Sequence, residues 1–353
     1  MESILLIKVF APTALTFCIG IFITPIVTHY LFQYKVWKKV GGKTAIGGQA
    51  AVEFNRLKGS NETKTPRMGG IVIWGSVFMT VSLLFTLKTL LPHSIFSQLD
   101  FFSRSQTWIP LSTFAIGALI GFLNDYYDVT HTGRGLTLRV RVTLTTILAG
   151  AIGWWFYSKL GVETINLPFG HEIFLGILII PFFILLTNGL YASGVIDGID
   201  GLAGGVFASI FGAYAGVAFI QDQYDIAALS ATIAGGVLAF LWFNIPPARF
   251  WMTETGTMAL TLTLAVIVFM TDSLADGHGV FLLFIIGLPL IATVTSNVLQ
   301  ILARKAFKRK LFRIAPLHHH FEAIGWSSEK VTMRYWVISI ISAVIGISLV
   351  GII

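Results

Sequence analysis

Long apolar segments recur along the whole chain and constrain its fold more than any other feature. A membrane-spanning helix needs about 20 predominantly apolar residues, and ten stretches approach or exceed that length. They are residues 9–33, 69–91, 108–124, 142–159, 172–191, 202–220, 226–244, 257–271, 279–303 and 335–353. The sequence therefore predicts an all-α, polytopic integral membrane protein with about ten transmembrane helices, in a single domain covering residues 1–353.

The distribution of charge agrees with this class and orients the chain. Hydrophobic residues make up 55% of the sequence and charged residues 12%, whereas soluble proteins carry about 25% charged residues. Of the 24 Lys and Arg residues, all but Lys8, Lys88, Arg104 and Lys159 fall in the odd-numbered loops. The positive-inside rule places those loops in the cytoplasm and both termini outside. The net charge of the protein is +7. We expect membrane lipid around the protein and no nucleic acid among its partners.

Polar motifs gather in the same five loops. Ionisable residues are nearly absent from the centres of the apolar segments, where a transporter would place them. The motifs are TPRMGG (65–70), GFLNDYYDV (121–129), GVIDGIDGLAGG (194–205), WFNIPPARFWMTETGT (242–257) and IAPLHHHFEAIGW (314–326). They predict cytoplasmic active-site loops rather than a translocation path.

Acidic residues in three of these loops are candidate metal ligands. Asp125 and Asp128 follow the third apolar segment, Asp197 and Asp200 alternate with glycines, and Glu254 lies between two threonines. Mg²⁺ prefers oxygen ligands and bridges to substrate phosphates. Each acid alone is explained by helix capping or solvation, but acids from several loops on one face favour a Mg²⁺ site.

Three consecutive histidines, His318, His319 and His320, follow the basic segment 303–313. Adjacent residues of a helix point about 100° apart, so the three cannot ligate one metal. Their imidazoles can donate hydrogen bonds to phosphate oxygens. The alternative is an interfacial cluster without a catalytic part, and attraction to anionic lipid would also account for the basic segment.

Together these motifs resemble the bacterial phospho-N-acetylmuramoyl-pentapeptide transferases (the MraY family), within the polyprenyl-phosphate N-acetylhexosamine-1-phosphate transferase superfamily. The resemblance runs from about Thr65 to the C-terminus, and the histidine segment is its most specific part. It implies a bacterial inner-membrane enzyme with a cytoplasmic active site, Mg²⁺ as cofactor and a possible homodimer. The implied substrates are UDP-N-acetylmuramoyl-pentapeptide and undecaprenyl phosphate, and the products are lipid I, a peptidoglycan precursor, and UMP.

The resemblance also assigns roles to individual residues. Those implied to be catalytic are Asp125, Asp197, Asp200, His318, His319 and His320, and we expect a catalytic role for Asp128 as well. Those implied to bind substrate are Asn244, Trp251 and Gln300, and we expect Lys64 and Thr65 to bind substrate too. The expected Mg²⁺ ligands are Asp125, Asp197 and Glu254.

Several positions depart from the family pattern. Asn124 replaces the first acid of an Asp-Asp pair, Glu254 replaces an aspartate that holds Mg²⁺, and Arg67 replaces a threonine. We expect Asp128, one helical turn from Asn124, to replace the lost acid in part, and the longer side chain of Glu254 to weaken Mg²⁺ binding or favour Mn²⁺. Two alternatives stay open: a transferase using another UDP-sugar, and a non-catalytic membrane homologue.

Overall fold

The computed structural model describes residues 2–39, 63–130, 135–274 and 277–352. Its α-helices are α1 (Glu2–Gln33), α3 (Gly70–Leu90), α4 (Phe96–Leu99), α5 (Trp108–Thr130), α6 (Leu138–Leu160), α7 (Ile179–Ser193), α8 (Leu202–Ile220), α9 (Tyr224–Asn244), α10 (Thr253–Ser273), α11 (Gly279–Ile286), α12 (Leu288–Phe307), α13 (Leu317–Ala323) and α14 (Ser328–Leu349). The remaining elements are the strands β1 (Thr164–Leu167) and β2 (His171–Phe174) and the 3₁₀ turns η1 (Gly176–Leu178) and η2 (Gly194–Ile196).

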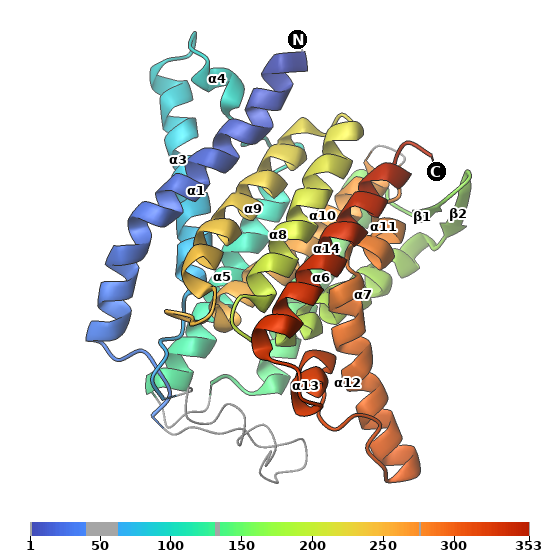
Figure 1. Ribbon diagram of the computed structural model, residues 1–353. Coiled ribbons are helices and arrows are strands. Elements are labelled where there is room, and N and C mark those ends of the chain that lie inside the picture. Colours follow the sequence, from blue (N-terminus) through green and yellow to red (C-terminus); the bar gives the residue numbers. More distant parts are fainter. Residues whose placement is uncertain (1, 40–62, 131–134, 275–276, 353) are drawn as a thin grey trace.

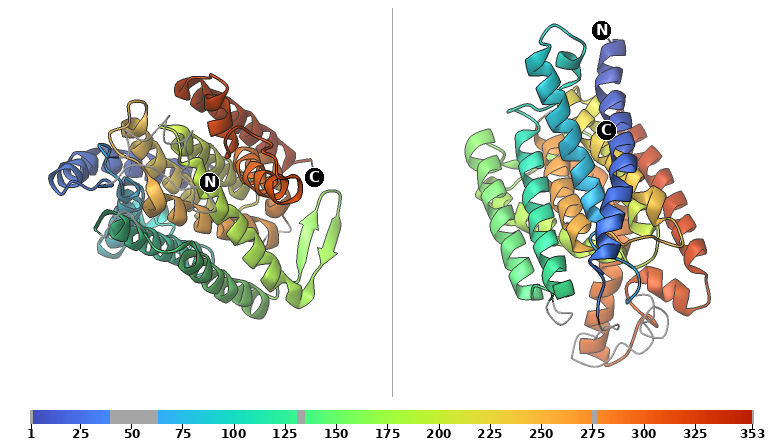
Figure 2. Two further views of the ribbon diagram at one scale, coloured as in Figure 1. Left: turned by 90° about the horizontal axis from the view of Figure 1, so that it is seen from below. Right: turned by 90° about the vertical axis from the view of Figure 1, so that its left-hand side faces the viewer.

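Helix α10 lies at the centre of the bundle. In its most apolar stretch 94% of the residues are buried, against 22% for α1 at the periphery. Its main neighbour is α5, while α9 packs against α1 and α8, and α14 packs on the outside of α8. Figures 1 and 2 show these helices running roughly along one direction, with both termini toward one end and α13 at the other.

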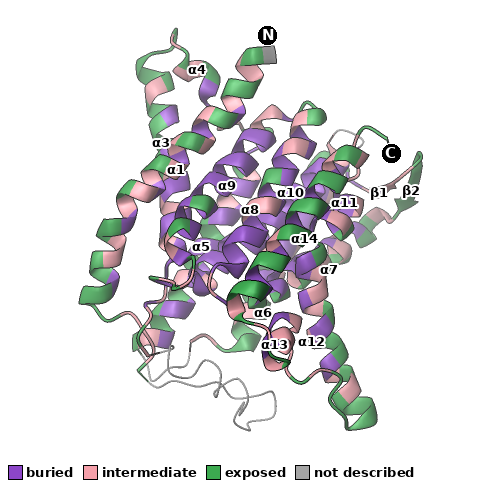
Figure 3. Ribbon diagram, viewed as in Figure 1, coloured by how far each residue is buried: buried purple, intermediate pink, exposed green. Residues whose placement is uncertain are grey.

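Apolar side chains cover the outside of the bundle as well as its core. Phe22 is 77% exposed and Leu185 is 72% exposed, although both lie in the middle of helices. Figure 3 shows buried residues concentrated on the central helices and exposed ones along α1, α3 and α14. An apolar exterior around an apolar core is expected when lipid, rather than water, surrounds the helices.

The predicted fold class is confirmed, since eight described helices are long and apolar enough to cross a membrane, or nine if α11 and α12 count as one broken span. The fourth predicted segment, 142–159, lies in α6, which is not among the helices that meet both criteria. Helix α6 has 23 residues, but Arg139, Arg141, Lys159 and three threonines lower its apolar character. Within the described ranges, fewer helices than the ten predicted are both long enough and apolar enough to cross a membrane.

Two predicted segments differ from the observed elements. The segment 172–191 begins in a β-hairpin, because β2 pairs antiparallel with β1 before α7 starts at Ile179. The segment 279–303 is bent by 76° between α11 and α12. Gly287 and Pro289 lie at the bend, and proline interrupts the hydrogen-bond ladder of a continuous helix.

Two glycines on one face of α5 allow it to approach α10 closely. A Cβ atom at Gly121 would lie 2.0 Å from the Glu254 carbonyl oxygen, and one at Gly117 would lie 2.9 Å from the Met258 carbonyl oxygen. Asp125 follows Gly121 by four residues and so lies on the same face of the helix. The small residues therefore press the Asp125 side chain against the first turn of α10.

Candidate active site

Asp125 is fully buried and accepts hydrogen bonds from the start of α10. Its Oδ2 accepts from the Thr253 hydroxyl at 2.5 Å, the Thr255 hydroxyl at 2.6 Å and the Thr255 amide at 2.8 Å. The Asn124 side-chain amide donates to Oδ1 at 3.2 Å. Neutral donors thus surround this carboxylate, which a buried charge requires.

Asp197 binds the same helix end from another loop. Its Oδ2 accepts the Thr253 backbone N–H at 2.7 Å. The first N–H groups of a helix have no partner within it and carry a partial positive charge. Asp125 and Asp197 therefore act as remote caps of α10. Thr253 has a φ of 54°, an uncommon left-handed conformation for a β-branched residue that these contacts hold in place.

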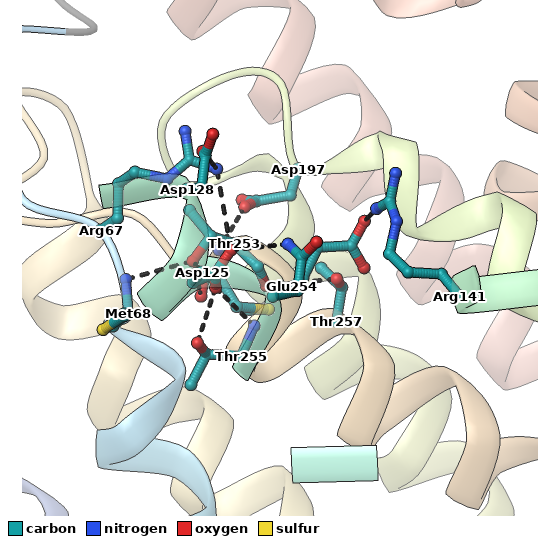
Figure 4. Close-up of polar contacts among 12 residues, drawn as sticks. Arg67, Met68, Asp125, Asp128, Arg141, Asp197, Thr253, Glu254, Thr255 and Thr257 are labelled. Carbon is teal, nitrogen blue, oxygen red and sulfur yellow. Dashed lines mark hydrogen bonds and ion pairs between the residues drawn. The ribbon is translucent and has the colours of Figure 1, made fainter. Parts of the chain in front are cut away.

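Two arginines approach this helix end from opposite sides in Figure 4. The Nη2 atom of Arg67 lies 3.2 Å from Asp128 Oδ2 and 3.8 Å from Asp125 Oδ1. The Nη1 atom of Arg141 on α6 forms an ion pair with Glu254 Oε1. The acids predicted from the sequence are thus brought together, but with fixed cations beside them.

Backbone contacts hold Arg67 in position. The Trp251 N–H donates to the Pro66 carbonyl at 2.8 Å, and the Gly69 N–H donates to the Trp251 carbonyl at 2.8 Å. A Cβ atom at Gly70 would lie 2.3 Å from the Gly256 nitrogen. The loop before α3 therefore packs directly on the loop before α10.

Asp200, Asn244 and Trp251 hold neighbouring loops together. Asp200 accepts the Trp251 indole N–H at 3.0 Å and the Ala248 N–H at 3.1 Å. The buried Asn244 amide accepts from the Gly201 N–H at 2.9 Å and donates to the Phe250 carbonyl at 2.8 Å. These contacts show an architectural part for all three. The catalytic role of Asp200 and the substrate-binding roles of Asn244 and Trp251 stay predictions.

Two of the three histidines face the loop that carries Asp197. A Cβ atom at Gly198 would lie 2.7 Å from His319 Nε2 and 2.8 Å from His318 Nε2, so only a glycine leaves room for both rings. His319 Nδ1 lies 2.7 Å from Glu322 Oε2, which fixes the orientation of the imidazole. Both rings are buried on α13.

His320 and Gln300 lie around the neighbouring loop instead. His320 Nδ1 accepts the Arg313 N–H at 3.2 Å. Gln300 accepts the N–H groups of Leu311 at 3.0 Å and Phe312 at 2.9 Å, and it donates to the Phe312 carbonyl at 3.1 Å. Gln300 therefore fixes the chain between α12 and α13, and its predicted contact with substrate stays a prediction.

Lys64 is exposed and Thr65 half-buried, at the edge of the described residues. The sequence reasoning missed Arg67 and Arg141 as partners of acids, and Thr253 and Thr255 as donors to Asp125. Arg67 stands inside a motif and departs from the family pattern, which is a usable signal. Nothing in the sequence signals Arg141, because it lies 113 residues from Glu254.

The arrangement does not fit a divalent-cation site as it stands. Metal ions need carboxylate oxygens that converge on one point. Here Asp125 Oδ2 accepts three hydrogen bonds, and Glu254 Oε1 faces a guanidinium. Across the described ranges no group of three or more His, Cys, Asp or Glu side chains is arranged to hold a metal ion. Mg²⁺ binding by Asp125, Asp197 and Glu254 stays a prediction.

Comparison with known proteins assigns the chain to a family. A family model described as glycosyl transferase family 4 matches residues 107–272. The chain is 33% identical to the phospho-N-acetylmuramoyl-pentapeptide-transferase of Geobacillus sp. (strain WCH70), covering 94% of this chain and 95% of the relative. It is 31% identical to the protein of that name from Listeria welshimeri, covering 95% of this chain and 97% of the relative. The chain therefore belongs to the phospho-N-acetylmuramoyl-pentapeptide transferase family.

Proposed function

We propose that this protein transfers phospho-N-acetylmuramoyl-pentapeptide from its UDP-linked precursor to undecaprenyl phosphate. An oxygen of the lipid phosphate forms a bond to the β-phosphorus of the nucleotide. The bond from that phosphorus to the bridging oxygen breaks, and the bridging oxygen leaves with UMP. The other product is lipid I, which serves peptidoglycan synthesis.

The meeting of the motifs at one end of the bundle carries this proposal. His318 and His319 lie against Gly198, next to Asp197, and Asp197 caps the helix that begins with Thr253 and Glu254. Residues from three separate loops are therefore connected around the start of α10. The names of the relatives supply the substrate class.

The chemistry asks for positioning and charge stabilisation more than for covalent catalysis. A phosphate monoester has a second pKa near 6, so the lipid nucleophile is largely a dianion at neutral pH and a base is not obligatory. This accounts for Asn124 where the family has an acid. The Nε2 atoms of His318 and His319 can interact with phosphate oxygens beside Gly198, and Glu322 holds the second ring in orientation.

We further propose that the protein lies in the bacterial inner membrane with this end of the bundle in the cytoplasm. The asymmetry of Lys and Arg supports that orientation, and the sugar nucleotide is a cytoplasmic metabolite in the proposed reaction. A homodimer remains a proposal from the family resemblance alone. So does a resident Mg²⁺, which the hydrogen-bonded Asp125 and the ion-paired Glu254 do not fit as they stand.

The test is release of UMP by the purified protein given undecaprenyl phosphate and UDP-N-acetylmuramoyl-pentapeptide. UDP-N-acetylglucosamine is supplied in a parallel reaction. We expect release with the muramoyl substrate. Release with N-acetylglucosamine alone would support a transferase for another sugar, and no release from folded protein would support a non-catalytic homologue.

A matched pair of variants tests the histidine site. His319→Gln should lower the rate about 100-fold, within the range by which positioned acid–base groups act. His93→Gln changes an exposed histidine between α3 and α4, at the other end of the bundle, and should leave the rate unchanged. Equal rates for the two variants would contradict a role for His319 in the reaction.

A further inference from the structure

Two guanidiniums are built into the group of acids that the sequence predicts to hold a metal. Arg67 contacts Asp128 and Asp125 through Nη2, and Arg141 contacts Glu254 through Nη1. Their side chains are 14% and 21% exposed, so solvent screens them less than surface charges. Positive charge is thus already present where a divalent cation is expected.

Two of the acids are satisfied by donors other than the arginines. Asp125 receives three donors from α10, and Asp197 receives the Thr253 amide. Backbone and hydroxyl donors alone are sufficient to stabilise a carboxylate. A guanidinium carries five N–H donors. The buried Nε atoms of Arg67 and Arg141 have no hydrogen-bond partner within the described part of the chain, so donor capacity remains.

We propose that Arg67 and Arg141 bind the diphosphate of the sugar nucleotide in place of a divalent metal ion. This inference rests on the proposed function, because it concerns the substrate of the same site. Guanidinium groups form paired, charge-assisted hydrogen bonds with phosphate oxygens. Held on opposite sides of the start of α10 (Figure 4), the two cations neutralise charge on the nucleotide before and during its transfer.

The same geometry disfavours the metal. A divalent ion beside Arg67 or Arg141 is repelled by the guanidinium, and its prospective ligands already accept hydrogen bonds or form ion pairs. Arg67 stands where the family has a threonine, and Glu254 stands where it has an aspartate. Both departures from the family pattern bring an arginine and an acid into contact. The longer Glu254 side chain reaches Arg141 on α6, and Arg67 reaches Asp128 on α5.

Binding of UDP tests this inference, because UDP carries the diphosphate common to UDP-sugars. Affinity is measured by titration calorimetry on the full-length protein, in EDTA and in Mg²⁺. We expect equal affinity in the two buffers. Arg67→Gln and Arg141→Gln should each weaken binding in EDTA about 10- to 100-fold, as charge-assisted hydrogen bonds are lost. Arg139→Gln, an exposed arginine on the same helix as Arg141, should bind like the parent.

Paired substitutions separate phosphate binding from simple neutralisation of the acids. In Arg67→Gln/Asp128→Asn and in Arg141→Gln/Glu254→Gln, no carboxylate of the pair is left without its cation, which protects folding. We expect UDP binding to stay weak in both double variants. Recovery of parental affinity would overturn the inference, because it would mean that the arginines serve only the acids.

The outcomes also separate this inference from the proposed function. UMP release that occurs in Mg²⁺ and stops in EDTA, with UDP binding lost in parallel, would overturn the arginine inference and leave the transferase function standing. Metal-independent UDP binding that requires both arginines, in a protein that releases no UMP, would support the inference and contradict the function. Failure to bind UDP in EDTA overturns the inference in every case.

Discussion

A buried carboxylate lies at each end of α10, but the two carboxylates are stabilised by different kinds of partner. At the C-terminal end, Asp272 accepts the backbone N–H groups of Val280 at 3.0 Å and Asn166 at 3.2 Å. At the N-terminal end, Asp125 accepts comparable neutral donors, and Arg67 lies near it in addition. Both aspartates are 0% exposed.

The comparison shows that neutral donors suffice for a buried acid in this protein. Asp272 joins α10 to β1 and to the start of α11, and it forms no ion pair with any residue that the structure describes. Arg67 therefore adds a positive charge that Asp125 does not need, while Arg141 is paired with Glu254. The contacts at the C-terminal end of α10 stabilise the fold, whereas those at the N-terminal end also form the candidate active site.

The largest expected effect is that of Asp125→Ala. This change leaves the Thr255 amide, two hydroxyl groups and part of the Arg67 charge without a partner in a buried site. We expect a loss of about 3–5 kcal/mol in the free energy of unfolding. The loss is measured as the thermal unfolding temperature in detergent. Asp125→Asn keeps an acceptor oxygen and should lose less; equal losses would show that charge, not hydrogen bonding, holds α10.

Asp272→Ala should separate stability from function at the opposite end. It leaves two buried backbone N–H groups unsatisfied, which costs about 1–3 kcal/mol. The rate of UMP release per folded molecule should equal that of the parent. A lower rate per folded molecule would contradict this expectation, because it would mean that the C-terminal end of α10 takes part in the reaction.

Trp251→Phe tests the loop contact beside the active end. The substitution keeps an aromatic ring and removes the indole donor to Asp200, so we expect a loss of about 0.5–1.5 kcal/mol. Thermal unfolding gives the stability, and the Michaelis constant for the sugar nucleotide gives the effect on binding. A Michaelis constant that rises far more than stability falls would support the predicted substrate contact of Trp251.

Asp128→Asn has the smallest expected effect. The direction of its effect on UDP affinity distinguishes two roles for Asp128. Releasing Arg67 from this largely buried ion pair should tighten UDP binding by roughly fivefold, because the guanidinium becomes free to bind phosphate oxygens. If Asp128 instead replaces the acid missing at Asn124, the turnover rate falls. Measuring UDP affinity and turnover together distinguishes these two roles.

Much of the fold could be predicted because the membrane requires long apolar helices, and their length is visible in the sequence. The β-hairpin before α7 was missed since residues 172–178 continue an apolar segment. The bend between α11 and α12 was missed for the same reason. Residues 142–159 form a predominantly apolar stretch and so predict a span, but the whole of α6 also includes Arg139 and Arg141.

The location of the candidate site could also be predicted, but its internal contacts could not. The charge asymmetry and the positions of the motifs predict that Asp125, Asp197 and Glu254 lie at the same end of the helix bundle. Which donor each acid meets depends on tertiary packing: Asp125 and Thr255 are separated by 130 residues. For the same reason, Asn244 and Gln300 bind backbone groups that no sequence pattern identifies.

The burial of α10 has a consequence for the motions of this protein. A helix anchored at both ends and surrounded along its length opens only when its neighbours separate. Its amide hydrogens should therefore exchange with deuterium last, after those of the lipid-facing α1 and α14. Rearrangements during turnover then take place in the elements around α10, which serves as the fixed axis of the molecule.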